Sequence, residues 1–413
     1  MDVVGHVPAP GPPRSVGLQA VLIAGATAIA QVLVAVIYIV TARDTDPATY
    51  GAVVTAIAVG TSAAGLVDFG SNAFWTREAA SGRTPAIDLG ERVSGKLLLA
   101  LALAVIATVA TAVFAPAYVA TGAILISVLL GQTMLIPLRA LRRGETVALL
   151  LLVERVAAVV LFGAFTSTGM EPTTALWIAL ALGTLTLAAI AGALTPSSER
   201  MRLFTGWPRN PWAGSRHYGW SSIAASAQQL DLPLLGIVAG PAAAGLYGAV
   251  NRWTQPMQLL SGAFSSASAP FLAQAEGWSQ ARKIVLRSSW MLFLAVGVCI
   301  ALAVTAPLIV HFLLGDQYDG SAEILQWLAL GTIPAIFNQP IVSALQARRF
   351  DHLVAVPWLV CVAIQLALIA VLGPALGALA AAIAFTTLQV LLFAILTGCL
   401  IYAVRTEVAA TRR

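Results

Sequence analysis

The sequence predicts an all-α integral membrane protein in which twelve transmembrane helices form two parallel six-helix bundles. The first observation is composition, because 59% of the 413 residues are hydrophobic and only 10% are charged, a balance that soluble globular chains do not show. The second is that apolar runs long enough to cross a bilayer recur along the whole chain. The third is an internal repeat whose copies lie half a chain apart, as in transporters with two lobes.

The expected transmembrane segments follow one another with short connections, so no separate soluble domain is expected. In order, they are 18–41, 50–68, 93–115, 117–138, 147–168, 173–195, 217–239, 242–264, 288–312, 322–345, 353–372 and 375–402. They divide the chain into an N-terminal tail (1–17), an N-lobe (18–195), a linker between the lobes (196–216), a C-lobe (217–403) and a C-terminal tail (404–413).

The distribution of basic residues predicts the orientation of the chain. If the N-terminus is cytoplasmic, 20 of the 23 Lys and Arg residues fall on that side, among them Lys96 and Arg139, while Arg155 and Arg252 lie within spans. This asymmetry is what the positive-inside rule requires, so both termini are expected in the cytoplasm. The first span is too long for a cleaved signal sequence and is expected to remain as an anchor. Topology explains the net charge of +5, which therefore indicates no nucleic-acid partner.

Composition also indicates where the protein is found and what it lacks. A chain rich in Ala, Val, Gly and Arg with only two lysines is typical of a GC-rich bacterial genome, so the inner membrane is expected. Cys299, Cys361 and Cys399 lie within spans at no metal-ligand spacing and are interpreted as small packing residues. No metal, cofactor or catalytic residue is expected.

The internal repeat is seen in Tyr50-Gly51-Ala52-Val53 and Tyr247-Gly248-Ala249-Val250, which begin spans 2 and 8 and lie 197 residues apart. Six spans in each half make the two halves enter the membrane in the same direction, so the repeats are parallel. Amphipathic segments at 69–92 and 266–287 occupy matching places after spans 2 and 8 and are expected to lie at the membrane surface. The linker carries four Arg and two Trp residues and is interpreted as lying on anionic lipid. The alternative is a docking surface for a biosynthetic partner or a substrate pyrophosphate.

Span 7 contains a carboxylate at membrane depth, which makes it a functional candidate. Asp231 follows Gln229, and Pro233 removes the hydrogen bond that the Gln229 carbonyl would otherwise accept. A carboxylate beside a free carbonyl suits a proton or a sodium ion, so Asp231 and Gln229 are candidate ion-coupling residues. The alternative is that Asp231 forms a structural pair with a neighbouring span.

Span 8 carries a polar stripe, since Tyr247, Asn251, Gln255 and Gln258 recur at helical spacing with Arg252 on the flank. Such a stripe cannot face lipid and must line a cavity or another helix. An arginine in a wet cavity suits a phosphate, because its guanidinium donates two parallel hydrogen bonds. Arg252 also lies at a depth where it could pair with Asp231.

Other polar residues lie inside the spans. Glu154 and Arg155 are adjacent in span 5, so they point about 100° apart and are not expected to pair. Arg155 either extends to the headgroups or faces the cavity and attracts anionic cargo. Uncharged candidates either bind sugar hydroxyls or hold helices together: Gln31 and Asn338, with Thr27, Gln132, Gln339, Gln365 and Gln389 as further members of the set.

Several stretches of this sequence resemble one family. Leu66-Val67-Asp68-Phe69-Gly70-Ser71-Asn72-Ala73 followed by Arg77-Glu78, then Gln229-Leu230-Asp231, Gly245-Leu246-Tyr247-Gly248-Ala249, Pro270 and Leu314-Gly315-Asp316-Gln317-Tyr318 are similar to motifs of the Wzx-type polysaccharide flippases in the MOP superfamily. The resemblance covers nearly the whole chain. It implies a MOP/MATE-like fold of two bundles around a central cavity, which works by alternating access.

The resemblance also implies a cargo and partners. The cargo would be a polyprenyl-(pyro)phosphate-linked sugar or oligosaccharide moved to the outer leaflet, with membrane lipids, H⁺ or Na⁺ and other polysaccharide-assembly proteins as partners. The family's cationic cavity and ion coupling map onto Arg252, Arg155 and Asp231. Arg155 and Arg252 are the only basic residues expected deep inside the spans. So few positive charges favour a short or neutral glycan on a single phosphate.

Two other functions remain open at this point. A MATE-like drug or cation antiporter would use acidic cavity residues, and the chain offers Asp231 and Glu154 for that role, although the Arg77-Glu78 motif argues against it. A polytopic glycosyltransferase that uses a lipid-linked donor would need acids in the first outer loop, where Asp44 and Asp46 lie. That loop is short, and no outer domain exists to hold an acceptor.

Overall fold

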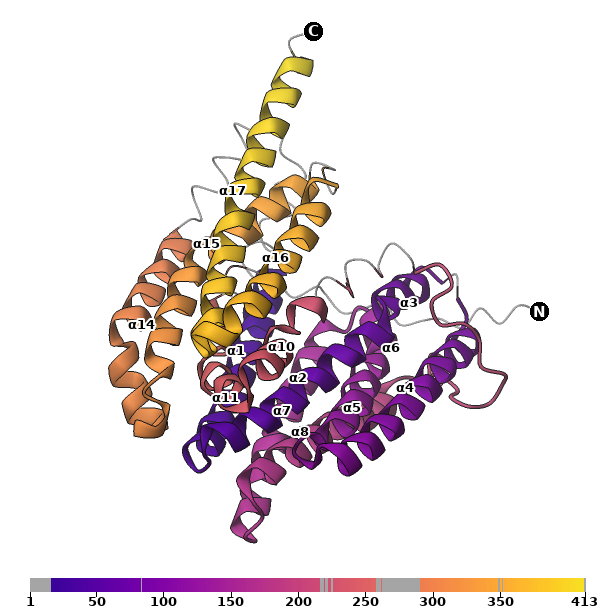
Figure 1. Cartoon of the computed structure of the whole chain (residues 1–413). Coiled ribbons are helices and arrows are strands. Elements are labelled where there is room, and N and C mark those ends of the chain that lie inside the picture. Colours follow the sequence, from indigo (N-terminus) through magenta and orange to yellow (C-terminus); the bar gives the residue numbers. More distant parts are fainter. Residues whose placement is uncertain are drawn as a thin grey trace, which may run out of the picture.

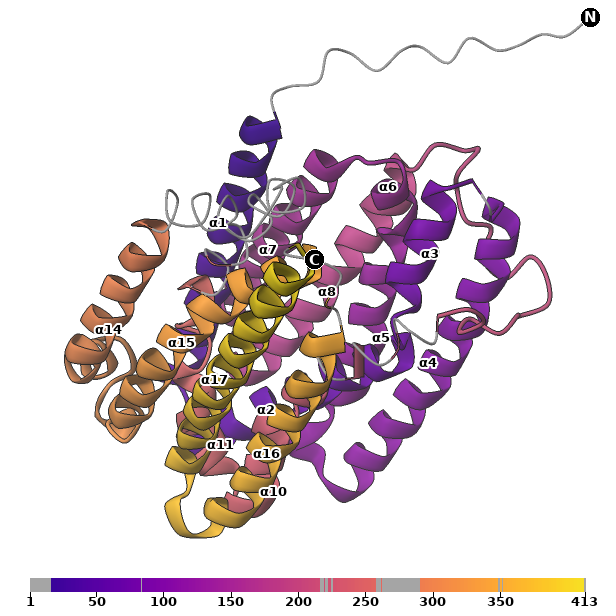
Figure 2. The same cartoon turned by 90° about the horizontal axis from the view of Figure 1, so that it is seen from above.

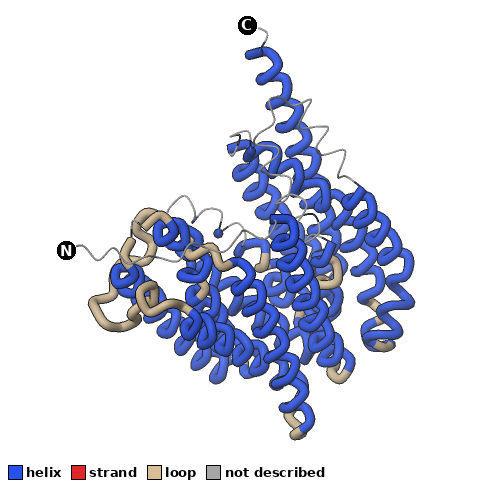
Figure 3. The backbone as a smooth tube through the Cα atoms, turned by 180° about the vertical axis from the view of Figure 1, so that it is seen from behind, coloured by secondary structure: helices blue, strands red, loops and turns tan. Residues whose placement is uncertain are grey.

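The structure is a computed structural model that describes residues 16–82, 84–215, 219, 222–223, 226–257, 261, 290–347, 350 and 352–411. The described residues form helices joined by short loops and contain no strand (Figure 3). The expected N-terminal tail up to residue 15, the surface segment at 266–287 and Gln258 lie outside the described residues.

The helices of the first half begin with a long one and follow the expected order. They are α1 (Val16–Arg43), α2 (Pro47–Asp68), α3 (Ser71–Ala80), α4 (Ala86–Phe114), the 3-10 turn η1 (Pro116–Tyr118), α5 (Ala120–Met134), α6 (Ile136–Ala140), α7 (Gly144–Ser167) and α8 (Pro172–Leu194). The prediction of a surface segment at 69–92 is wrong about where that segment ends. Only α3 is a separate short helix there, because α4 begins at Ala86 and continues into the membrane span.

The second half repeats this pattern with shorter described pieces at its start. Its elements are α10 (Asp231–Ala239), α11 (Pro241–Val250), α14 (Trp290–Leu314), the 3-10 turn η2 (Asp316–Tyr318), α15 (Ser321–Ala347), α16 (His352–Leu376) and α17 (Ala378–Thr411). α17 continues through most of the residues 404–413 that were expected to form a separate tail.

Nine helices among the described residues are long and apolar enough to cross a membrane, and α1 contributes the further apolar stretch Ile29–Arg43. The expected spans 18–41, 217–239 and 242–264 fall on stretches that the structure describes only in part. The fold is therefore the predicted all-α membrane architecture of two helical bundles.

Local sequence sets the turn between α1 and α2. The Asp46 carboxylate accepts hydrogen bonds from the main-chain N–H groups of Ala48 and Thr49 at 2.9 and 3.1 Å, and Pro47 occupies the first helical position. Hydrogen bonds from Thr49, through its side chain and main chain, hold the pKa of the Asp46 carboxyl below its ordinary value. Asp46 therefore starts α2, a structural role for one of the acids considered for catalysis.

The two bundles diverge toward the end at which α17 finishes and meet at the opposite end (Figure 1). We call these the tail end and the crossing end. From above, α3 to α6 lie on one side of the molecule and α14, α15 and α17 on the other (Figure 2). At the crossing end one hydrophobic core joins both halves and includes Tyr50, Leu176, Tyr247 and Tyr318. Toward the tail end each bundle has apolar clusters of its own.

Backbone contact brings α2 and α11 together at the crossing end. A β-carbon on Gly51 would overlap the carbonyl oxygen of Pro241, and one on Gly245 would overlap the carbonyl oxygen of Pro47. Glycine permits this approach because it has no side chain. The repeated Tyr-Gly-Ala-Val stretch of each half thus lies where the two halves cross.

Candidate functional site

A cavity of about 1060 Å³ lies between the bundles. Its wall is formed by α1, α2 and α5 to α8 from the first half and by residues 228–232, α11, the turn after α11 and α15 to α17 from the second. This volume is at the upper end of the roughly 300–1,000 Å³ that small-molecule sites occupy. The volume therefore accommodates a molecule at the large end of this range.

Most of the predicted site residues line this cavity. They are Gln31, Arg155, Gln229, Asp231, Tyr247, Asn251, Arg252 and Gln255. Asn338 does not: it is buried in α15, and its amide nitrogen donates to the Gln389 side-chain oxygen at 3.0 Å. Asn338 therefore holds α15 against α17.

Span 7 is interrupted beside Asp231. The main-chain N–H groups of Gln229 and Leu230 donate to carbonyls three residues back, those of Ser226 and Ala227, and α10 begins only at Asp231. Gln229, whose carbonyl the sequence predicts to be free, lies at this interruption. Pro233 lies in the first turn of α10, where its missing N–H costs no helical hydrogen bond.

Span 8 is also interrupted where it meets the cavity. α11 ends at Val250, and the turns that follow are closed by bonds from the N–H groups of Trp253 and Gln255 to the carbonyls of Val250 and Arg252, at 3.0 and 3.2 Å. The sequence predicts that the polar residues of this span form one stripe on a regular helix. The break after Val250 means that they do not. Discontinuous helices at membrane depth are typical of transporter binding sites, because they expose main-chain groups to the cavity.

Asp231 is bound within its own half of the protein. The Tyr247 hydroxyl donates to Oδ2 at 2.7 Å, and the main-chain N–H of Leu232 donates to Oδ1 at 2.7 Å. The carboxylate lies at the start of α10, where the helix dipole stabilises negative charge. Arg252 lies elsewhere, 4.1 Å above the ring of Tyr38 in α1. The expected pair between Asp231 and Arg252 is thus replaced by two separate contacts.

Glu154 and Arg155 do interact, which corrects the sequence-based expectation. Arg155 Nη2 lies 3.7 Å from Glu154 Oε1, because the long arginine side chain turns back toward its neighbour. Thr184 in α8 also donates to Glu154 Oε1, at 2.7 Å. Arg155 lines the cavity rather than leaving it for a headgroup layer.

Sequence reasoning missed one cationic residue of the cavity. Arg139 was counted among the cytoplasmic charges together with Arg142 and Arg143, yet it lines the cavity. It lies in α6, a short helix that starts after α5 has ended and carries Pro137 in its first turn. That proline was the available signal that the helix is interrupted before the loop.

The cavity wall carries more cationic than anionic groups, and it is rich in amides. Its arginines are Arg139, Arg155 and Arg252, and its acids, Glu154 and Asp231, already accept the hydrogen bonds described above. Eight side-chain amides complete the polar lining: Gln31, Gln132, Gln228, Gln229, Asn251, Gln255, Gln339 and Gln365. Such a wall can bind an anion and many hydroxyl groups together.

The crossing end of the cavity is closed by contacts between η2 and the turn after α1. Gln317 Nε2 donates to the carbonyls of Arg43 and Thr45 at 3.2 and 3.1 Å, and the Tyr318 hydroxyl donates to the Thr45 carbonyl at 3.3 Å. Tyr318 also packs edge-on against Tyr50, with ring centroids 6.1 Å apart.

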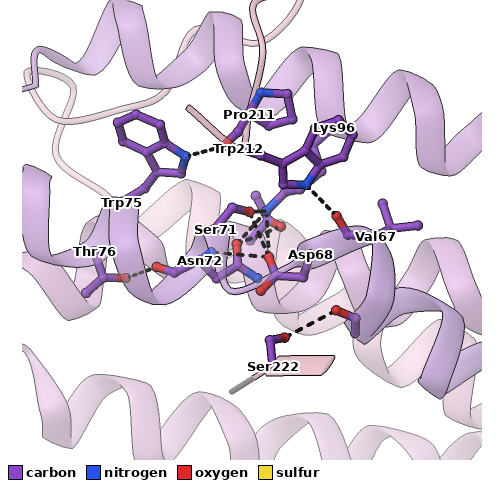
Figure 4. A network of polar contacts seen from close by, with 12 residues as sticks. Val67, Asp68, Ser71, Asn72, Trp75, Thr76, Lys96, Pro211, Trp212 and Ser222 are labelled. Carbon is purple, nitrogen blue, oxygen red and sulfur yellow. Dashed lines mark hydrogen bonds and ion pairs between the residues drawn. The ribbon is translucent and has the colours of Figure 1, made fainter. Parts of the chain in front are cut away.

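A buried polar network lies near the tail end of the first bundle (Figure 4). Lys96 Nζ donates to Asp68 Oδ1 at 3.0 Å, to Ser71 Oγ at 3.0 Å and to Asn72 Oδ1 at 2.7 Å. We expected Lys96 on the cytoplasmic surface, but its side chain is 1% exposed. The family-like Asp68-Phe69-Gly70-Ser71-Asn72 stretch is therefore the acceptor side of a buried ion pair.

The segment between the bundles packs on the first one. Trp75 Nε1 donates to the Pro211 carbonyl at 2.8 Å, and Trp212 Nε1 donates to the Val67 carbonyl at 3.0 Å (Figure 4). The Nε atom of Arg209 lies 2.7 Å from Oε2 of Glu91 in α4. In the linker, Trp212 therefore contacts α2 and Arg209 contacts α4, while Trp75 of α3 bonds the linker main chain. These two linker side chains do not lie on lipid as expected.

The known structures that the chain resembles share its fold. A multidrug resistance MATE family transporter of the MOP superfamily in an inward-facing conformation aligns with a TM-score of 0.68 and 12% identity, over 92% of this chain and 95% of its own. The lipid II flippase MurJ in an inward closed conformation aligns with a TM-score of 0.69 and 13% identity, over 91% and 86%. An outward-facing structure of a MATE family transporter gives 0.56 with 15% identity, over 94% and 96%. No curated protein sequence matches the chain.

The family itself is shown by sequence. A family model described as polysaccharide biosynthesis protein matches residues 40–323, from the end of α1 to the start of α15. The matched region contains α2, α10 and α11, the helices that cross between the bundles, together with both interrupted spans. The chain therefore belongs to the polysaccharide biosynthesis protein family, on the fold of MOP superfamily transporters.

Proposed function

We propose that the protein is a flippase that moves a polyprenyl-(pyro)phosphate-linked sugar or oligosaccharide from the inner to the outer leaflet of the bacterial inner membrane. The proposal includes the two lobes and the cytoplasmic termini that the sequence predicts, with α17 continuing into the predicted C-terminal tail. The observation that carries the proposal is the cavity wall: three arginines and eight amides face one space, while both acids are already bound. The cargo would serve cell-surface polysaccharide biosynthesis, the process for which the family is named.

The chemistry of the wall matches the two polar parts of such a cargo. Arginine forms bidentate hydrogen bonds with phosphate oxygens, and primary amides both donate to and accept from sugar hydroxyls. Arg252 lies near the crossing end of the cavity, beside Tyr38. Arg139 in α6 lies toward the tail end. A phosphate group can therefore bind an arginine near either end of the cavity. Three arginines in the wall provide enough positive charge for a pyrophosphate as well as for a phosphate.

The closed crossing end and the divergent tail end describe one state of an alternating-access cycle. In the proposed orientation the tail end is cytoplasmic, so this is the loading state. The higher TM-score with the inward-facing than with the outward-facing MATE structure, 0.68 against 0.56, supports this assignment. Opening to the other side requires the contacts of η2 and of α2 with α11 to separate.

Arg252→Ala is the direct test of the proposed function. Loss of charged hydrogen bonds to a phosphate, at about 1.5–3 kcal/mol, is expected to reduce glycan export by roughly ten- to a hundredfold. The measurement is the labelled glycan that reaches the outer surface of cells with the gene replaced. Arg405→Ala, which removes an exposed arginine from α17, is the matched control and should export normally. Normal export by Arg252→Ala, at equal amounts in the membrane, would refute the role of Arg252.

Asp231→Asn tests whether transport is coupled to an ion. Asparagine keeps the shape of the side chain and can still bond Tyr247 and the Leu232 N–H, so the fold is expected to be retained. If Asp231 carries the coupling proton or sodium ion, transport in proteoliposomes no longer responds to an imposed pH or Na⁺ gradient. Glu154→Gln, at the other cavity acid, is the control and should preserve that response. A gradient response in Asp231→Asn equal to that of the wild type would exclude the coupling role.

The arrangement of acids also distinguishes the flippase from the alternatives. An antiporter for organic cations needs a carboxylate available to the cation, whereas Glu154 and Asp231 are engaged by Thr184, Arg155 and Tyr247. A glycosyltransferase would use Asp44 and Asp46, but Asp46 caps α2. We therefore propose transport without a catalytic step.

A further inference from the structure

We propose that Gln365 is a sugar-binding residue that recognises neighbouring hydroxyl groups of the glycan; this inference rests on the proposed flippase function. Gln365 lies in the middle of α16 and forms part of the cavity wall. Its side chain is fully buried, and neither its amide nitrogen nor its amide oxygen has a hydrogen-bond partner in the described part of the chain.

An unpartnered buried amide requires an explanation, because a polar group that loses water and gains no hydrogen bond destabilises the protein. Gln389, on the adjacent helix α17, is a buried glutamine whose side-chain oxygen has a partner. It is nearly as buried, and its side-chain oxygen accepts from Asn338 at 3.0 Å. Gln389 does not line the cavity, whereas Gln365 does. The difference indicates that the partner of Gln365 arrives from the cavity.

The hydrogen-bonding groups of the Gln365 amide indicate which part of the cargo it would bind. A primary amide presents a donor and an acceptor side by side, which complements two adjacent hydroxyl groups, one accepting and one donating. A phosphate offers only acceptor oxygens in its charged form, so it would leave the amide oxygen unsatisfied. The polyprenyl chain offers no polar group at all. A sugar ring is thus the part of the cargo that satisfies both amide atoms.

The surroundings of Gln365 support a sugar rather than an ion. The C-lobe wall of the same cavity includes Leu232, Leu328 and Phe385, which belong to one apolar cluster. Each comes from a helix other than α16. The wall therefore offers apolar surface beside its amides and arginines. A sugar ring can use both, because its hydroxyl groups bond amides and its apolar face packs on side chains such as Leu328 and Phe385, whereas an ion has no apolar face.

The test uses Gln365→Leu in the purified full-length protein and two probes. The first is undecaprenyl phosphate, which carries no sugar, and the second is the polyprenyl-linked glycolipid fraction extracted from cells that make the protein. Gln365→Leu is expected to weaken binding of the glycolipid fraction about tenfold, the effect of two lost hydrogen bonds. Its binding of undecaprenyl phosphate should be unchanged, and its melting temperature should not fall, because an unsatisfied amide has been removed.

Gln389→Leu is the matched control, since it removes a buried glutamine that has a partner. It should lower the melting temperature and leave the affinities for both probes unchanged. If wild type binds the glycolipid fraction but Gln365→Leu binds both probes as wild type does, or loses both equally, the sugar-binding role is overturned and the flippase proposal stands. If wild type binds neither probe, the proposed function fails, and this inference fails with it.

Discussion

Gly51→Val is expected to abolish transport while the protein remains folded in the membrane. A β-carbon at this position would overlap the carbonyl oxygen of Pro241, which is main chain and cannot move aside as a flexible side chain would. The valine therefore forces α2 and α11 apart at the crossing end. Each bundle keeps its own apolar clusters near the tail end, so the lobes are expected to stay folded. A transporter that cannot close this end loses alternating access.

Two measurements check this expectation. Glycan export reports transport, and labelling of an Ala244→Cys reporter by a soluble maleimide reports closure, since Ala244 is fully buried at the crossing end. Labelling should be slow in the parent and fast with Gly51→Val. Gly163→Val is the matched control, because a β-carbon on Gly163 in α7 meets no atom within 4 Å. Normal export together with slow labelling in Gly51→Val would show that the crossing does not depend on this glycine.

Lys96→Met is expected to lower the free energy of unfolding by about 3–5 kcal/mol, the usual cost of removing one partner of a buried ion pair. The Asp68 carboxylate would keep its bonds from the Ser71 hydroxyl and the Asn72 N–H but would lose its counter-charge. The variant is expected to be less abundant in the membrane, because a loss of this size is a large part of a protein's stability.

The measurement is thermal unfolding of purified wild type and variants in one detergent. The double variant Lys96→Met with Asp68→Asn is the control. It removes both charges and keeps acceptors for Ser71 and Asn72, so it should regain most of the lost stability. A double variant as unstable as Lys96→Met alone would mean that packing of the lysine chain, and not the unpaired charge, dominates.

The sequence allowed the helical architecture and much of the cavity to be predicted, for one physical reason. Charged and amide groups are costly in a bilayer, so Arg155, Asp231 and Arg252 stand out against an apolar background, and all three line the cavity. At the ends of the spans charged residues are common, so a functional charge does not stand out from its neighbours there. Arg139 and Lys96 lie there, and the positive-inside rule counts them without showing which way they point.

The pairings and the helix breaks could not be predicted. Tyr247 bonds Asp231 across sixteen residues, and Tyr38 lies under Arg252 from another helix. Such contacts depend on tertiary packing, which hydropathy does not record. The breaks before Asp231 and after Val250 are hidden because polar residues occur at ordinary helical spacing through both. Only the closing hydrogen bonds show that the backbone tightens there.

The bonds of Trp75 with Pro211 and of Trp212 with Val67 also bear on where the lobes would pivot. Further along the connection, the Ser222 hydroxyl donates to the Gly65 carbonyl of α2 at 3.3 Å. These described parts of the connection are therefore bonded to the first bundle. If the lobes rock against each other as proposed, we expect the pivot to lie close to the start of α10 and not at the end of α8.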